Sequence, residues 1–67
     1  MKITLNNKEE IFDCELLTIT DLLKLKNYTF RMLVIKINNQ LVKKSEYEQA
    51  KVKDGDDVMI LHLISGG

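Results

Sequence analysis

Proline is absent from the sequence, and cysteine and histidine each occur only once. A single thiol, that of Cys14, cannot form an intrachain disulfide or assemble a thiolate metal cluster. The lone histidine, His62, has no second histidine with which to hold a metal ion, and no serine–histidine–acid set can be assembled around it. We therefore expect Cys14 to be a small core hydrophobe and His62 to be a surface or interface residue on the last strand.

Charge of one sign and long apolar runs are also missing. Ten basic residues balance ten acidic ones, which argues against nucleic-acid binding because such domains usually carry a basic excess. No apolar run approaches the ~18 residues of a membrane-spanning helix, and the first residues lack the features of a signal peptide. We expect a cytoplasmic protein with one domain over residues 1–67 that binds neither nucleic acid nor membrane.

Glycine is scarce, so the positions of the three glycines are informative. Gly55 lies in the turn signal Asp54-Gly55-Asp56, and Gly66 and Gly67 stand at the end of the sequence. There is no glycine-rich phosphate loop of the Rossmann or P-loop kind, and the aspartates around Gly55 lack the downstream glutamate of a calcium loop. The sequence thus predicts no catalytic residue, no metal site and no bound cofactor, which argues against an enzyme.

Alternating apolar residues and turn signals predict five strands. Residues 1–5 alternate between apolar and polar, as a half-buried strand requires, and the asparagine pairs at 6–7 and 38–39 are typical of tight turns. We expect the first two strands to form a hairpin. The predicted strands span residues 1–5, 9–13, 32–37, 40–43 and 57–63.

A short helix is predicted to begin after Leu17. Thr18 is a candidate N-cap and Asp21 completes a capping box, while Leu17 and Leu22 occupy the positions of a hydrophobic staple. A helix of two to three turns cannot be stable alone, so it must pack on the sheet. Its expected apolar stripe comprises Ile19, Leu22, Leu23 and Leu25.

Aromatic residues beyond the helix are expected to complete the core. Tyr28 and Phe30 follow the helix end, where they can pack beneath it. Ser45 is a candidate cap for a single turn, and this turn would place Tyr47 against the core.

The predicted order of strand, strand, helix and three further strands indicates an α+β domain with the helix on one side of the sheet. The compact small fold with this order is the β-grasp, or ubiquitin-like, arrangement. It has a mixed sheet of about four to five strands with one main helix packed on one face. Its first and last strands lie side by side and parallel in the centre.

The last predicted strand is apolar on both faces. Val58 and Ile60 alternate with Met59 and Leu61, and Leu63 follows. Because one helix covers only one face of a sheet, Met59, Leu61 and Leu63 are expected to be partly exposed. Exposed apolar surface on a small domain often marks a partner site, and this strand leads directly into the tail at residues 64–67.

The terminal Gly66-Gly67 is suited to a specific chemistry. Two residues without side chains can pass through a slot that would exclude any Cβ atom. The free carboxylate of Gly67 can attack the α-phosphate of ATP and form an acyl-adenylate, from which a sulfur or nitrogen nucleophile displaces AMP. The alternative is a small, flexible terminus without a function.

Short segments in a common order connect the chain to a known family. They are the Met-Lys-Ile start, the Asn6-Asn7 turn, Thr18-Ile19-x-Asp21-Leu22-Leu23, Ile37-Asn38-Asn39-Gln40-Leu41-Val42, Asp54-Gly55-Asp56 with Val58 and Ile60, and Ile64-Ser65-Gly66-Gly67. Together they resemble the ThiS family of sulfur carriers of thiamin biosynthesis over essentially the whole chain. The chain departs from the usual family sequence near Glu15–Leu17, at Lys43-Lys44 and at Tyr47. These differences concern contacts with partners and leave the tail unchanged.

This resemblance implies a carrier whose chemistry is catalysed by its partners. A ThiF-type adenylating enzyme, using ATP and magnesium, would adenylate Gly67. Sulfur from cysteine, delivered by a cysteine desulfurase, would then convert the carboxylate to a thiocarboxylate. The thiazole synthase ThiG would take that sulfur into the thiazole ring of thiamin, while Ile64, Ser65 and Gly66 would lie in the partner's channel.

Three other functions share parts of this pattern. The small subunit of molybdopterin synthase has the same fold, the same end and a thiocarboxylate, although its chains are usually longer. A ubiquitin-like protein modifier would instead form an isopeptide bond through Gly67. A β-grasp interaction domain would carry the tail without using it.

Overall fold

The computed structural model describes residues 1–28 and 32–62. The positions predicted for Phe30, Leu63 and the tail at 64–67 therefore lie outside the described residues. The elements, in chain order, are β1 (Lys2–Leu5), β2 (Lys8–Ile11), β3 (Leu16–Thr18), α1 (Ile19–Leu25), β4 (Leu33–Ile37), β5 (Gln40–Val42), the 3₁₀ turn η1 (Lys44–Glu46), β6 (Lys51–Lys53) and β7 (Asp57–His62).

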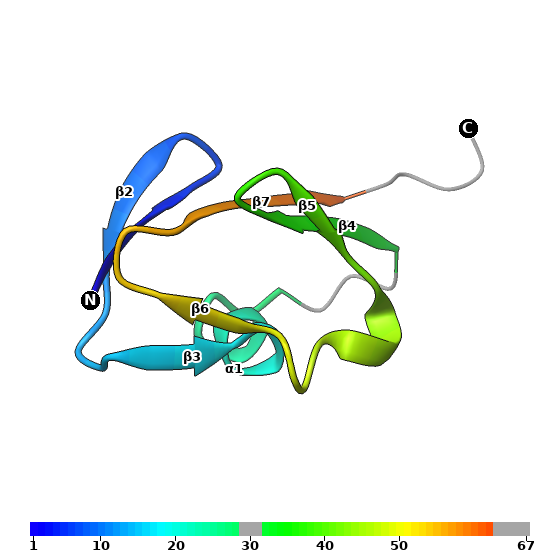
Figure 1. The fold of residues 1–67 in the computed structure, drawn as a ribbon, viewed down its shortest axis with the longest axis horizontal. Coiled ribbons are helices and arrows are strands. Elements are labelled where there is room, and N and C mark those ends of the chain that lie inside the picture. Colours follow the sequence, from blue (N-terminus) through cyan, green and yellow to red (C-terminus); the bar gives the residue numbers. More distant parts are fainter. Residues whose placement is uncertain (29–31, 63–67) are drawn as a thin grey trace.

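One mixed sheet of five strands, in the order β2-β1-β7-β4-β5, forms the first layer of the molecule. β1 and β7 are parallel neighbours near its middle, and the other pairs in this sheet are antiparallel. In Figure 1 this sheet lies above α1, β3 and β6, which form the second layer. The expected α+β, β-grasp architecture with a central parallel pair is confirmed.

Asparagine pairs close both hairpins of the main sheet. Asn6 and Asn7 have φ of 51° and 67°, and Asn38 and Asn39 have φ of 51° and 68°. Two consecutive residues at positive φ are typical of the two-residue type I′ turn, whose twist matches that of the strands it joins. Asparagine tolerates this conformation better than most residues with a side chain, so the predicted turns are confirmed.

The helix begins with the predicted capping box. Thr18 Oγ1 accepts a hydrogen bond from Asp21 N at 3.0 Å, and Asp21 Oδ2 accepts one from Thr18 N at 3.3 Å. The helix ends at Leu25, after which Asn27 turns to a φ of 58° and Tyr28 N donates to Leu23 O at 2.8 Å. This bond, together with the positive φ, is the Schellman pattern of helix termination.

Leu25 does not belong to the buried stripe, contrary to the sequence prediction. It is 59% exposed, whereas Ile19 and Leu22 are fully buried and Leu23 packs partly against the core. The reason is the early end of the helix. The helix has only seven residues and its buried residues are Ile19 and Leu22, so Leu25, its last residue, lies beyond the buried stripe.

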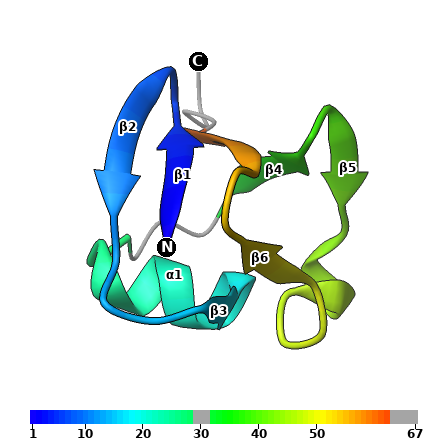
Figure 2. The ribbon, with the colours of Figure 1, turned by 60° about the vertical axis from the view of Figure 1, so that its left-hand side comes forward.

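The second layer contains a small sheet that was not predicted. β3 pairs with β6 in antiparallel register, from Leu16↔Lys53 to Thr18↔Lys51, and Figure 2 shows this pair beside α1. Each strand has only three residues, too few to establish a period of two, and the pairing joins segments far apart in the sequence. The predicted strand at 9–13 also proves to begin and end earlier, as β2.

The core lies between the two layers. Phe12, Cys14, Tyr28 and Tyr47 pack against it as partly buried residues, as expected for the last three. Ser45 does not cap the turn before Tyr47; it lies inside η1, where Glu46 Oε1 accepts a hydrogen bond from Lys43 N at 3.0 Å. Among the described residues, the fully or nearly buried apolar ones are Ile3, Leu5, Leu17, Ile19, Leu22, Ile35, Val52, Val58 and Ile60.

Candidate functional site

The candidate site is centred on β7, the strand that leads into the Gly66-Gly67 end. β7 pairs with β4 along its length, from Ile37↔Val58 to Leu33↔His62. Its pairing with β1 stops at Leu5↔Val58. Beyond this point the side chain of Asn6 takes over, because Ile60 N donates to Asn6 Oδ1 at 2.8 Å. The backbone is therefore held on both sides as far as Ile60 and by β4 as far as His62.

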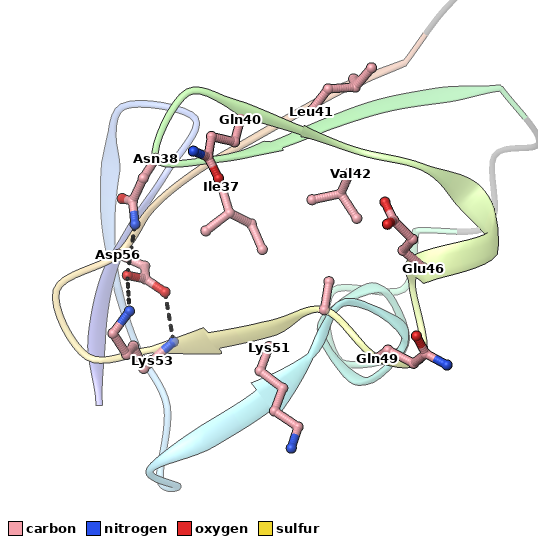
Figure 3. A pocket seen from close by; sticks show the side chains of 11 residues that line it. Ile37, Asn38, Gln40, Leu41, Val42, Glu46, Gln49, Lys51, Lys53 and Asp56 are labelled. Carbon is pink, nitrogen blue, oxygen red and sulfur yellow. Dashed lines mark hydrogen bonds and ion pairs between the residues drawn. The ribbon is translucent and has the colours of Figure 1, made fainter.

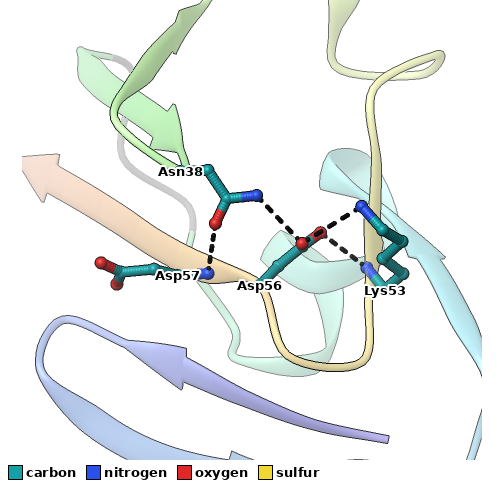
Figure 4. A network of polar contacts seen from close by, with 4 residues as sticks. All are labelled: Asn38, Lys53, Asp56 and Asp57. Carbon is teal, nitrogen blue, oxygen red and sulfur yellow. Dashed lines mark hydrogen bonds and ion pairs between the residues drawn. The ribbon is translucent and has the colours of Figure 1, made fainter.

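A buried carboxylate fixes the start of β7. Asp56 is 4% exposed and accepts hydrogen bonds from Lys53 N at 2.9 Å and from Asn38 Nδ2 at 3.0 Å. The Lys53 ammonium adds an ion pair at 3.3 Å. Asn38 also accepts a hydrogen bond from Asp57 N at 2.9 Å, so its amide bridges the two aspartates (Figure 4). The network joins the β4–β5 turn to the β6–β7 turn.

The charge state of Asp56 follows from this network. Burial by itself raises the pKa of its carboxyl, because the charged form loses water. The hydrogen bonds from Lys53 N and the Asn38 amide, and the Lys53 ammonium, act in the opposite direction and outweigh burial. The pKa of Asp56 is consequently lower than its usual value, and the carboxylate is ionised at neutral pH.

The face of the main sheet opposite α1 carries an exposed apolar patch. Met59 and Leu61 were predicted to lie there; Met59 is half-buried and Leu61 is 49% exposed. The register adds Val34, opposite Leu61, and Leu41, which is 62% exposed. We call these four residues, Val34, Leu41, Met59 and Leu61, the apolar patch.

A hollow of about 360 Å³ lies within this face, and it is bounded by Val34, Met59 and Leu61 of the apolar patch. Its remaining walls are polar and are formed by Lys36, Asn39 and Asp57. The hollow is thus apolar toward the end of β7 and polar toward its beginning. Apolar surface bordered by polar groups is common at protein–protein interfaces.

A second hollow, of about 640 Å³, opens between the β4–β5 hairpin and β6. Figure 3 shows Gln40 and Glu46 on one side of it and Lys51 and Lys53 on the other. Asp56 lies at its edge, but the hydrogen bonds of that carboxylate are made within the protein. Its lining mixes both signs of charge with apolar side chains, and sequence reasoning did not anticipate it.

The residues considered for metal binding lie apart from one another. Across the described ranges there is no group of three or more His, Cys, Asp or Glu side chains that could hold a metal ion. His62 is exposed on β7, as predicted, and Cys14 is half-buried against the core. No helix in the described part is long and apolar enough to span a membrane.

The comparisons with known proteins agree with this architecture. A model of the ThiS family matches residues 2–67. The chain belongs to the ThiS family. A crystal structure described as a thiamine biosynthesis protein (ThiS) from Geobacter metallireducens superposes with a TM-score of 0.87 and 32% sequence identity, covering 100% of both chains. Comparison with functionally curated proteins finds no match.

A solution structure of a thiamine biosynthesis protein from the same organism is also similar to the chain. It has a TM-score of 0.78 and 32% identity, and the likeness covers 100% of this chain and 88% of that one. Within this ThiS-family framework, the sequence located two members of the apolar patch on β7 but missed Val34 and Leu41. The doubly apolar run of β4 was the available signal for Val34, whereas Leu41 joins the patch only through strand order.

Proposed function

We propose that the protein is a sulfur carrier of thiamin biosynthesis and that the loaded group is the carboxylate of Gly67. The observation that carries this proposal is the match to the ThiS family over residues 2–67, which includes Gly66-Gly67. Support also comes from the solved structures that the chain resembles, which are described as thiamine biosynthesis proteins. In this role the chain is a co-substrate, and the catalytic residues belong to its partners.

Loading proceeds in two stages on Gly67. The carboxylate attacks the α-phosphate of ATP, pyrophosphate leaves, and an acyl-adenylate forms. A persulfide sulfur then attacks the carbonyl carbon and AMP leaves, after which a thiol reduces the sulfur–sulfur bond and a thiocarboxylate remains. A ThiF-type enzyme would supply the site for ATP and magnesium, a cysteine desulfurase the sulfur, and a ThiG-type thiazole synthase the acceptor.

The geometry of β7 limits where the partner can sit. Gly67 is the fifth residue after His62, the last residue of β7, and five extended residues reach at most roughly 17 Å. An enzyme that holds Gly67 in its active site must therefore lie close to the end of β7. We propose that the apolar patch, with Met59 and Leu61 on β7 itself, is the surface on which that enzyme docks, together with Leu63, while Ile64, Ser65 and Gly66 enter its channel.

Intact-mass measurement tests the loading. The purified chain is mixed with a cognate ThiF-type enzyme, ATP, magnesium, cysteine and a desulfurase. We expect one oxygen to be replaced by sulfur, and fragmentation to locate the change at Gly67. An unchanged mass with an enzyme that is competent on another carrier would contradict the proposal, and higher-mass conjugates would identify a protein modifier instead.

A substitution on the patch extends the same assay to the docking surface. Leu61→Asp places a charge in the apolar patch and should raise the KM for loading at least tenfold, because a buried unpaired charge is costly at an interface. Leu16→Asp is the matched control, since Leu16 is also 49% exposed but lies on β3 in the other layer. Equal loading of both variants would remove the apolar patch from the proposal without affecting the role of Gly67.

A further inference from the structure

Lys36 lies between two apolar residues on the face of the sheet opposite α1. β5, β4 and β7 are adjacent, and the register places Leu41 and Met59 directly opposite Lys36 on its two sides. Directly paired residues project from the same face of a sheet. The row therefore reads Leu41, Lys36, Met59, and Val34 with Leu61 forms the next pair toward the tail. A cation thus stands inside the apolar patch.

This cation forms no ion pair within residues 1–28 and 32–62. The ion pairs of this part of the chain use Lys2, Lys26 and Lys53. Asp57 lines the same hollow as Lys36 but does not form an ion pair with it. Lys36 is nevertheless half-buried among apolar neighbours, where an ammonium that loses more water on docking needs a partner.

We propose that Lys36 selects the docking partner by pairing with a carboxylate that the partner presents within an otherwise apolar surface. This inference rests on the proposed function and names the chemistry of the surface on the adenylating enzyme. A partner with an apolar or a basic group at that place would bury Lys36 unpaired or against a like charge. Such mismatches are the usual means by which interfaces reject wrong partners.

A second copy of this chain does not fit the same face as well. A symmetric dimer uses the same patch on both subunits, and a two-fold axis that passes near the row of Leu41, Lys36 and Met59 would bring Lys36 close to its own copy. Like charges directly opposed are destabilising. The face also includes Met59 and Leu61 of β7, and Gly67 is only five residues from the end of that strand in the sequence, so an enzyme that holds Gly67 lies close to this face.

The test uses the loading assay together with rapid-mixing measurements of association at low and moderate salt. Lys36→Met removes the charge while keeping an apolar stem, and Lys36→Glu reverses the charge. We expect the affinity of the cognate adenylating enzyme to fall about tenfold for Lys36→Met and about a hundredfold for Lys36→Glu. The association rate of the unmodified chain should fall as salt rises, and that of Lys36→Met should be less sensitive to salt.

Lys51→Met and Lys51→Glu are the matched controls, because Lys51 is an exposed strand lysine on β6 in the other layer and forms no ion pair among the described residues. They should load as the unmodified chain does. Thermal unfolding of each variant is the control for folding: a melting temperature close to that of the unmodified chain means that a change in affinity does not reflect loss of the fold.

The outcomes separate this inference from the proposed function. If the unmodified chain is loaded and Lys36→Glu is loaded with the same KM, the selection by Lys36 is wrong while the carrier role stands. If the unmodified chain is not loaded at all, the proposed function fails first. Sedimentation of the chain alone should show a monomer, and a dimer that Leu61→Asp dissociates would assign the face to a second copy and overturn the inference.

Discussion

All five asparagines of the chain adopt a positive φ, and together with Gly55 they account for the positive-φ residues described. Two pairs close the hairpins of the main sheet and Asn27 ends the helix. Asn6 and Asn38 do more, because their side chains also bind the backbone of β7, at Ile60 N and Asp57 N respectively. At the residue scale, the turns therefore position the strand that carries the candidate site.

Asp56→Asn should lower the free energy of unfolding by about 2–3 kcal/mol at neutral pH, because an amide cannot accept all the hydrogen bonds that this buried carboxylate accepts. The folded-state pKa of Asp56 is lowered, below the value of about 3.9 for an unfolded chain. Its contribution is therefore complete above about pH 4 and is lost as the pH falls through the folded-state pKa.

Urea unfolding of both proteins at neutral pH and near pH 3 checks this expectation, and the difference between them should shrink in acid. Asp13→Asn is the matched control, since Asp13 is exposed and accepts no hydrogen bond among the described residues. A pH-independent difference would show that the charge of Asp56 is not what stabilises the turn.

At the scale of the elements, α1 is stabilised by the hydrogen bonds at its two ends and by its buried side chains, and not by its length. Seven residues cannot form a stable isolated helix. The capping box at Thr18 and Asp21 and the Schellman bond to Leu23 satisfy backbone groups at both ends. The buried side chains of Ile19 and Leu22 then attach the helix to the sheet.

Thr18→Ala should lower the free energy of unfolding by about 0.5–2 kcal/mol, because the N–H of Asp21 loses its acceptor. Thr20→Ala is the control, since Thr20 lies inside the helix and alanine favours helices more than threonine does. Thermal unfolding of the two variants measures the contrast. An equal loss of stability in Thr18→Ala and Thr20→Ala would mean that the loss comes from the packing of the threonine side chains and not from the cap.

At the scale of the whole molecule, stability and the proposed loading depend on different parts of the chain. The core lies between the main sheet and the layer of α1, β3 and β6, and its buried residues within 1–28 and 32–62 all fall between Ile3 and Ile60. The proposed chemistry belongs to Gly67. Changes at the two places should therefore separate folding from function.

Deletion of Gly67 should leave the melting temperature nearly unchanged while ending loading, because no core residue is altered and the reacting carboxylate is displaced by one residue. Gly55→Ala should do the opposite. Gly55 has a φ of +87° and nothing within 4 Å of an added Cβ, so alanine costs about 1–2 kcal/mol through its backbone conformation alone. Loading of the folded Gly55→Ala variant should be retained.

Circular dichroism and intact-mass measurements on both variants check these two expectations. A large fall in melting temperature on deletion of Gly67 would mean that the end of the chain is structural. Loading of the shortened chain would mean that the terminal glycine is not the reacting residue.

Most of the fold could be predicted from local signals, because each of these signals involves only a few consecutive residues and can be recognised in the sequence. Strand alternation, the asparagine turns and the Thr18–Asp21 box each depend on neighbours in the chain. Short pairings between distant segments, such as β3 with β6, leave no such signal. The same limit applied to Asp56, which was recognised only as a turn residue because its partner Asn38 lies eighteen residues away.

The sequence by itself determined the β-grasp order of elements, the two asparagine turns, the helix cap, and the Gly66-Gly67 end on which the proposed chemistry depends. Only the tertiary structure decided that Lys36 stands between Leu41 and Met59, and that Asp56 is buried beneath Asn38. Periodicity assigns a residue to a face of its own strand. Which residues become neighbours across that face depends on strand order and register, and these are set by the packing of the whole chain.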